Sequence, residues 1–270
     1  MSVGDLTSLA NAKAWLFGVD PQGFAATQKP IQAVTQAANA QVTCAGHGFA
    51  QGQQVLLSNI GGMAPLSGLV VTVAVIDANT FSIGVDTTGY PAYTGGGVAS
   101  AEDVILARLI SATSQDAETY MGRAIAQAVY SEAWDGNGRG KMFFPNAPAS
   151  AVSALTVGGV AIPAGVVTVG QTTPPGYYIT DRGAALTLLG YAFACGIQNV
   201  QVSYTAGYAT TPPDLEQAVI EAVAYRYKER LHVGVASQSA AGQLSASFSQ
   251  KPWPDHVQAV LDRYRKAALA

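Results

Sequence analysis

The 270-residue sequence has few charged side chains. Asp, Glu, Lys and Arg make up 11% of it, against about 25% in a typical soluble domain, while hydrophobic residues reach 49%. High hydrophobicity with low charge excludes an intrinsically disordered chain. So few charged side chains cannot cover the surface of a folded chain. This favours a surface that further copies of the chain partly cover. A soluble monomer with a Ser, Thr, Gln and Gly surface is the alternative.

An excess of basic residues is also missing. The chain has 14 Lys and Arg against 17 Asp and Glu, which gives a net charge of −3. Proteins that grip nucleic acid cluster Lys and Arg against its phosphates. The composition therefore excludes a strong DNA binder but allows a protein through which DNA passes without specific binding.

Long apolar runs and a secretory signal are absent too. No run approaches the ~18–20 apolar residues that cross a membrane. Residues 1–18 carry Asp5 and Lys13 in a helical pattern, unlike a basic-then-apolar leader. We therefore expect a soluble protein made in a cytoplasm, with no membrane partner. Two cysteines, Cys44 and Cys195, are too few for a disulfide framework.

Groups that carry catalysis are scarce. The three histidines, His47, His232 and His256, stand in no recognisable nucleophile motif. Cys44 and His47 offer two metal ligands without a second pair, whereas a structural zinc site takes four. We therefore expect no catalytic residue and no metal.

One glycine-rich segment superficially resembles a phosphate-binding loop. Its Gly140-Lys141 pair has Asp135 where the Walker motif has its first glycine, and Met142 where the motif has Ser or Thr. The segment also follows a helical pattern instead of leading from a strand into a helix. The sequence therefore predicts no nucleotide cofactor and no enzyme.

Four stretches show helical periodicity. Residues 5–17 begin with Asp5 as a candidate cap, and a stripe of apolar residues over 102–128 has 4-3-4 spacing. The strongest pattern covers 213–232, and a final helix follows Pro254. The predicted buried stripe of the third helix is Leu215, Val219, Val223, Tyr227 and Leu231.

Two other regions read as β structure. Residues 30–99 and 141–207 contain short runs rich in Val and Thr, separated by Gly, Pro, Asn and Asp turns. Residues 95–97, three glycines, read as an exit linker, and 234–250 read as a linker or mobile loop because they are Ser, Ala, Gly and Gln-rich. The flanks of 30–99 read together as one helix–turn–helix, which indicates an inserted domain.

The predicted fold is α+β. A helical-bundle core comprises residues 1–29, 100–140 and 208–270, with 141–207 as a β-hairpin element and 30–99 as an inserted small β-barrel or sandwich domain.

The order of several short motifs resembles the head–tail connector, or adaptor, family of long-tailed bacteriophages. The motifs are Tyr120-Met-Gly-Arg123, Phe143-Phe-Pro145, Tyr204-Thr-Ala-Gly-Tyr208 and Pro212-Pro-Asp-Leu215. The resemblance implies a homo-oligomeric ring, usually a dodecamer, under the portal protein in the virion neck. Such a ring extends the DNA channel and offers a surface to the tail-completion, or stopper, protein. The chain would be made in the cytoplasm of the bacterial host.

The 30–99 segment departs from the simple family pattern. Its stretch from Val42 to Phe49 and its Asn79-Thr-Phe81 resemble small β-domains of phage tail and decoration proteins, similar to a β-domain of ubiquitin-activating enzymes. This resemblance concerns the fold alone. Two other functions stay open: another head- or tail-completion ring protein, or a β module that binds a glycan or receptor.

The C-terminal segment 244–270 is the predicted portal-docking segment. Aromatic side chains beside Pro252 and Pro254 suit an interface, and basic residues suit an acidic portal face. The alternative is that the tryptophan packs on the chain's own core. The candidate docking residues are Phe248, Trp253, Arg263, Arg265 and Lys266.

Overall fold

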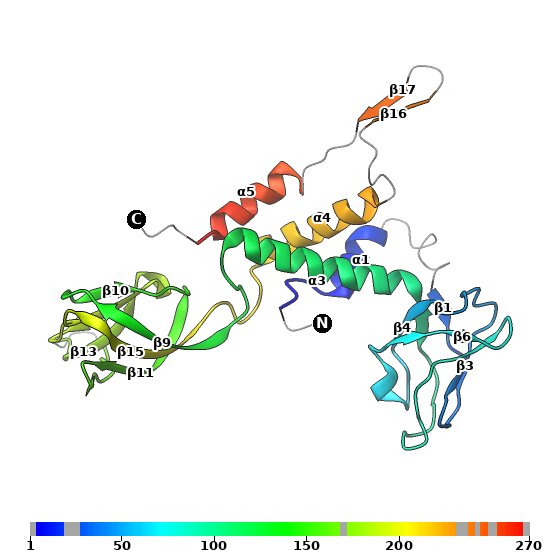
Figure 1. Cartoon of the computed structure of the whole chain (residues 1–270), viewed down its shortest axis with the longest axis horizontal. Helices are drawn as coiled ribbons and strands as arrows, with labels where there is room; N and C mark the ends of the chain where they lie inside the picture. The colour runs from blue at the N-terminus through cyan, green and yellow to red at the C-terminus, as the bar shows by residue number, and fades with distance from the viewer. Residues whose placement is uncertain are drawn as a thin grey trace. The chain divides into compact units, whose positions relative to one another are not determined.

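The computed structural model describes residues 4–18, 28–167, 172–230, 237–240, 244–247 and 253–266. Helices and strands both contribute, so the chain has an α+β fold (Figure 1). It divides into two compact units. The first comprises Met1–Gln115 and Gln217–Ala259, and the second comprises Asp116–Glu216 and Val260–Ala270.

Helix α1 (Leu9–Phe17) confirms the predicted first helix but begins later. Its cap is Ser8, whose side chain accepts a hydrogen bond from the backbone N–H of Asn11 at 3.0 Å. The prediction of Asp5 as the cap is wrong, because Ser8 is the extended residue immediately before the first turn. Lys13 of α1 pairs with the buried Asp103 at 2.9 Å, which ties α1 to the next helix.

Helices α3 (Ala101–Met121) and α4 (Pro213–Glu229) carry the apolar stripes that the sequence predicts. Val219 and Val223 are buried, while Leu231 lies outside the described residues. Tyr227 of α4 donates a hydrogen bond to Glu102 of α3, and the Arg230 guanidinium reaches the same carboxylate at 2.8 Å. These contacts fasten the two helices in the first unit.

The same unit contains a β-module, residues 28–100, made of two antiparallel sheets. The strand orders are β1-β8-β4-β5 and β2-β3-β7-β6. The strands are β1 (Gln28–Pro30), β2 (Ala33–Val34), β3 (Gln41–Thr43), β4 (Gln54–Ser58), β5 (Val70–Thr72), β6 (Ala74–Val75), β7 (Thr80–Ser82) and β8 (Val98–Ser100), with a 3-10 turn η1 (Ala64–Leu66).

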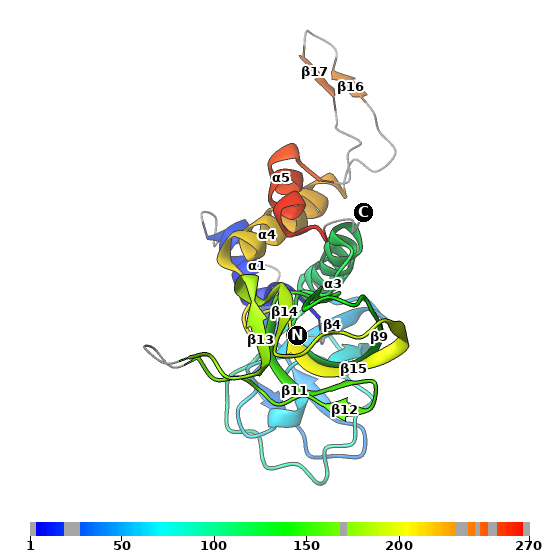
Figure 2. The same cartoon turned by 90° about the vertical axis from the view of Figure 1, so that its left-hand side faces the viewer.

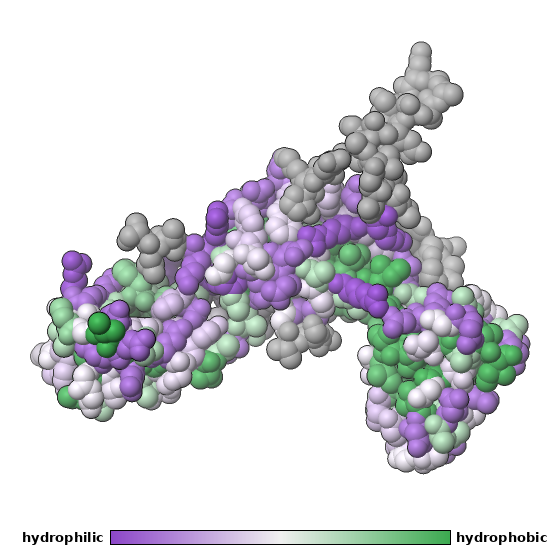
Figure 3. Space-filling view, viewed as in Figure 1, coloured by the Kyte–Doolittle hydropathy of each residue, from purple (hydrophilic) through white to green (hydrophobic). Residues whose placement is uncertain are grey.

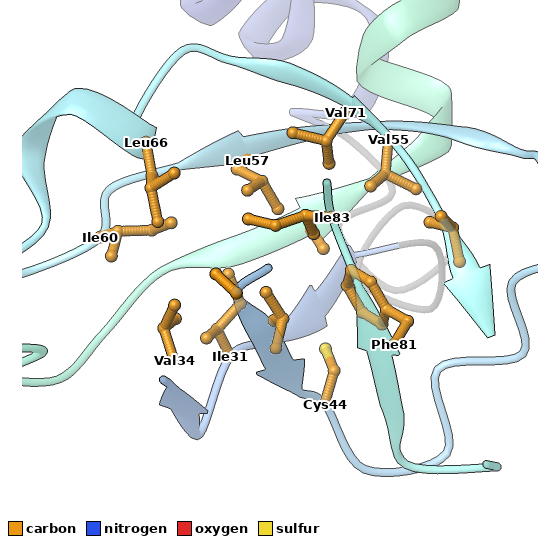
Figure 4. Close-up of a cluster of buried hydrophobic side chains, with 14 of the residues drawn as sticks. Ile31, Val34, Cys44, Val55, Leu57, Ile60, Leu66, Val71, Phe81 and Ile83 are labelled. Atoms are coloured by element: carbon orange, nitrogen blue, oxygen red, sulfur yellow. The ribbon is translucent and has the colours of Figure 1, made fainter. Parts of the chain in front are cut away.

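One apolar core joins the two sheets of the β-module. Figure 4 shows side chains of both sheets pointing into it, among them Val55 and Leu57 of β4 and Phe81 of β7. β1 pairs antiparallel with β8, with Gln28 opposite Ser100, so the chain enters and leaves the module on neighbouring strands. The short β8 was not predicted, and it follows directly after the glycines 95–97 that read as a linker.

The second unit contains the other β region, with sheets β10-β14-β13 and β12-β11-β15-β9 (Figure 2). It is more elaborate than the predicted β-hairpin element. The strands are β9 (Ala128–Gly136), β10 (Lys141–Phe143), β11 (Ala149–Val157), β12 (Val160–Ala161), β13 (Gly176–Thr180), β14 (Ala185–Leu189) and β15 (Gly196–Ala206), with a 3-10 turn η2 (Asp181–Gly183).

A carboxylate with three donors anchors β9 to the interior of this β region. Glu132 accepts hydrogen bonds from the Tyr204 hydroxyl at 2.9 Å, the Trp134 indole at 2.9 Å and the Asn146 amide at 3.0 Å. Tyr204 is fully buried, and burial raises the pKa of its phenol. A half-buried carboxylate with three donors holds neighbouring strands in register.

The helix predicted over 102–128 is too long. α3 ends at Met121, and Gly122 follows with a φ of 68°, a left-handed conformation that glycine adopts without strain. Residues 128–136 then form β9, where inward and outward side chains alternate. The region 100–140 is therefore helical only in its first part, because the alternation of β9 has the period of a strand.

Part of the segment predicted as a linker or mobile loop forms a hairpin. β16 (Ser237–Ala240) pairs antiparallel with β17 (Leu244–Ser247), with Ala240 opposite Leu244. The rest of 234–250 lies outside the described residues, as do positions 168 and 169 of the strand predicted at 166–169.

Candidate docking site

The C-terminal helix positions the predicted docking residues. α5 (Asp255–Tyr264) follows Pro254, as the sequence predicts, and buries Val257 and Leu261. Phe248 lies outside the described residues. Trp253 is only 6% exposed, and the Arg226 guanidinium stands 5.4 Å from its ring centre. Trp253 thus packs on its own chain, which is the alternative that the sequence left open.

Arg263 lies at the end of α5 and is largely exposed. Its guanidinium stands 3.6 Å from Asp214, and the Tyr264 hydroxyl donates to the same carboxylate at 2.6 Å. Exposed ion pairs of this kind contribute at most about 1 kcal/mol. Arg263 therefore keeps most of its charge available to a partner.

The two other predicted cations follow directly after the helix. The Arg265 guanidinium lies 5.6 Å from the centre of the Tyr120 ring, and the backbone N–H of Lys266 donates to the carbonyl of Met121 at 2.8 Å. Tyr120 also donates to Asp262 of α5 at 2.6 Å. The chain is thus fixed where it leaves α5, and both basic side chains are exposed.

Arg265 and Lys266 line a pocket of about 280 Å³, which we call the basic pocket. A third cation, Arg123, lines it as well, and none of the described lining residues is acidic. The remaining lining residues are Phe143, Phe144, Pro145, Ala147 and Ala184.

Arg123 lacks a compensating acid in the described part of the chain. Its guanidinium stands 5.7 Å from the Tyr208 ring centre. Its Nε and one terminal nitrogen are buried and have no hydrogen-bond partner among the described residues. An uncompensated, partly buried cation raises the electrostatic potential of its surroundings. Beside it, Phe143 is 55% exposed and gives the pocket an apolar rim.

The pocket therefore suits an acidic protein segment that also carries apolar side chains, because cations and an aromatic wall lie side by side. Sequence reasoning predicted Arg265 and Lys266 but missed Arg123 and Phe143 as site residues. The sequence shows both residues only as parts of the family motifs. They become site residues because the ends of α3 and β10 lie beside the end of α5 in the folded second unit.

The geometry offers little for other chemistry. The described residues contain no cluster of three or more His, Cys, Asp or Glu that could hold a metal ion. Among the described helices, none has both the length and the hydrophobicity to cross a membrane.

Comparison with known proteins identifies the family of the chain. The model of the head completion protein family matches residues 86–267. The chain belongs to the head completion protein family. It is accordingly a structural bacteriophage protein of head assembly and not an enzyme, and the resemblance to phage head–tail connector proteins is confirmed. A search of curated proteins gave no match.

A second family model covers most of the β-module. The FCCH domain of ubiquitin-activating enzyme E1 matches residues 37–102, which agrees with the resemblance seen in the sequence. This match concerns that one domain of those enzymes alone.

Two solved structures of a gene transfer agent particle are similar in part. The neck of the empty particle, computed with C6 symmetry, matches with 20% identity and a TM-score of 0.39, over 62% of this chain and 81% of that one. The virion of the native particle matches with 22% identity and a TM-score of 0.37, over 63% and 80%.

Proposed function

We propose that this head completion protein is a head–tail adaptor: a subunit of a ring, usually dodecameric in the adaptor family, that docks under the portal protein. The observation that carries the proposal is the basic pocket, where three cations meet an aromatic rim in a chain of net negative charge. Cations concentrated at one place on an otherwise acidic protein favour an acidic partner surface.

Exposed apolar side chains support assembly into a ring. Large hydrophobic residues lie open on several elements, including Ile197 at 88% and Val129 at 75% exposure. Together with the low charge content, these exposed apolar residues give further subunits apolar contacts to make. The ring would stand in the virion neck after synthesis in the host cytoplasm. It would let DNA pass without specific binding and present its other face to the tail-completion, or stopper, protein.

Within this proposal the docking residues have different roles. Arg263, Arg265 and Lys266 are exposed and would meet the portal directly, and Arg123 would strengthen the field of the pocket. Trp253 would anchor the segment to α4 through Arg226. Phe248 stays in the proposal as an apolar contact.

No observation favours a glycan- or receptor-binding β-module. The aromatic side chains suited to such a surface pack inward instead. Phe49 lies against His47 and Phe81, and Tyr93 lies within hydrogen-bond distance of the Ile31 carbonyl at 2.9 Å. Another head- or tail-completion ring protein would share the ring but not the portal contact, so portal binding separates that function from the adaptor.

The test is a double charge reversal, Arg265→Glu with Lys266→Glu, and portal binding by the purified chain. We expect binding to fall at least about tenfold, or 1.4 kcal/mol, because like charges would then face each other. The matched control is Lys228→Glu, at an exposed position on α4, which should bind normally. If the double variant folds, by circular dichroism, and binds portals at the wild-type level, the basic pocket is not the docking site.

A further inference from the structure

The first unit contains an open groove whose lining residues differ from those of the basic pocket. It has a volume of about 690 Å³ and lies between the β-module and the helices α1 and α3. Its walls are mainly apolar and include Leu9, Leu56, Val70, Val104 and Ile110. A void of this size holds several side chains, and the described residues do not fill it.

The groove exists because β4 presents apolar side chains on both faces. Val55 and Leu57 point into the core of the β-module and are fully buried. Leu56 lies on the opposite face and lines the groove, opposite Val70 of the edge strand β5. A sheet with one face toward water normally alternates apolar and polar residues; on this second face Leu56 is already only 8% exposed, whereas Val70 at 42% is left open.

The rim of the groove is open and carries a cation, Arg108, while Asp5 also lines the groove. Val70, which lines the groove, is 42% exposed, and Figure 3 shows hydrophobic residues gathered on the β4 side of the β-module. Arg108 is exposed at the rim, where its guanidinium donates to Gln54 at 2.6 Å. An apolar occupant with an adjacent carboxylate would satisfy both features.

The second unit displays such an element, a bulge at the start of β15. The pairing of β15 with β9 slips between Gly196 and Val200, and Ile197 within the slip is 88% exposed. Gln198 has a left-handed φ of 49°, and its backbone N–H donates to the Asp135 carboxylate at 2.7 Å.

The bulge is held firmly although its tip is exposed. Asn199 accepts from the Gly136 N–H at 2.9 Å and donates to the Ala194 carbonyl at 2.7 Å. A Cβ at Gly136 would stand 1.8 Å from that carbonyl oxygen, so the approach requires glycine. A bulge of this kind re-aims a side chain, and here it directs Ile197 away from the sheet into solvent.

We propose that the groove receives the Ile197 bulge of a second copy of this chain, with Asp135 of that copy facing Arg108. The proposal rests on the ring of the proposed function. A groove on one surface and an apolar bulge on another make a head-to-tail contact, and such contacts close into rings when the rotation permits. The pairing of the rim cation with an anion beside the bulge fixes the direction of the contact.

The test measures self-association of the full chain by sedimentation velocity over a concentration series. Ile197→Ser should raise the dissociation constant at least about tenfold. The control is Val160→Ser, which removes another exposed apolar residue, 60% exposed, from β12, and it should associate like the wild type. Circular dichroism checks that both variants fold.

A double-mutant cycle tests the charged pair. Asp135→Asn removes the charge but keeps an acceptor for Gln198, and Arg108→Gln removes the cation. If the two residues meet, the double variant should associate as well as either single variant. Additive losses would show that they do not meet.

The outcomes separate this contact from the ring itself. If wild-type chain associates and Ile197→Ser behaves like Val160→Ser, the groove contact is overturned while the ring stands. If Ile197→Ser associates normally but particles that carry it no longer attach tails, the bulge contacts another partner. The groove contact is then likewise overturned. If the wild-type chain stays monomeric both in solution and when bound to portals, the ring is contradicted, and this contact with it.

Discussion

Single residues at the end of α5 link the candidate docking site to the stability of the subunit. Tyr264 donates to Asp214, and burial, followed by this hydrogen bond and the nearby carboxylate charge, raises the pKa of its phenol from 10.0 to about 12. In the unfolded chain the phenol loses its proton at lower pH. Its stabilising contribution is therefore complete below pH 10.0 and is lost as the pH rises toward about 12.

We accordingly expect Tyr264→Phe to lose less stability than the wild type between pH 10.0 and about 12. The measurement is the free energy of unfolding in urea, below and within this window. Tyr191→Phe, at an exposed position, is the control and should follow the wild-type curve. Identical curves for Tyr264→Phe and wild type would show that the Asp214 contact does not persist in solution.

At the residue scale the sequence predicts best where one helix face decides burial. Val219, Val223 and Leu215 are buried because their spacing places them on one stripe, which needs no knowledge of the neighbours. Arg123 could not be identified as a site residue in this way. Its role depends on Tyr208 and on the end of α5, which the chain brings close only after folding.

Among the elements, α5 serves both the core and the candidate docking site. Trp253, Val257 and Leu261 are all buried, and each large apolar side chain contributes about 1.5–3 kcal/mol when buried. Domains are stable by only about 5–15 kcal/mol. Truncation before Leu244 removes all three side chains, so we expect it to destabilise the subunit as well as to abolish docking.

The midpoint of thermal unfolding checks this expectation. The matched comparison replaces only the hairpin from Ser237 to Ser247 with a short Gly/Ser linker and retains α5. Since an isolated two-stranded hairpin is marginally stable, that replacement should leave the midpoint nearly unchanged. An unchanged midpoint in the truncated chain would mean that α5 is not part of the core.

Elements differ in how far their sequences define them. α4 and α5 carry long stripes with clear ends, so their residues alone predict them. β1 and β8 have three residues each, too few for a period, and they become strands because they pair with each other. The sequence does not predict β9, because β9 follows soon after the apolar stripe of α3. The helix end at Gly122 depends on its left-handed φ, which the sequence alone does not show.

For the whole molecule, the β-module is the part whose removal is most informative. The sequence indicates that 30–99 is inserted, and the pairing of Gln28 with Ser100 supports this proposal because the two ends already lie together. We expect that a short Gly/Ser linker in place of 30–99 leaves the helices folded. Some stability should be lost, because Leu56 no longer lies near Val104 across the groove.

Far-UV circular dichroism of the shortened chain measures the outcome. The helical signal should persist, and by the groove proposal the chain should no longer associate with itself. Loss of the helical signal would show that the β-module is required for the helical core to fold.

The adjacent ends of the β-module also bear on how such genes change. A segment that begins and ends on paired strands can be gained or lost in one recombination event, since the flanking helices need not move to close the gap. The module has a core of its own, distinct from that of the second β region. We therefore expect gain or loss of the module to disturb the rest of the chain less than loss of a helix would.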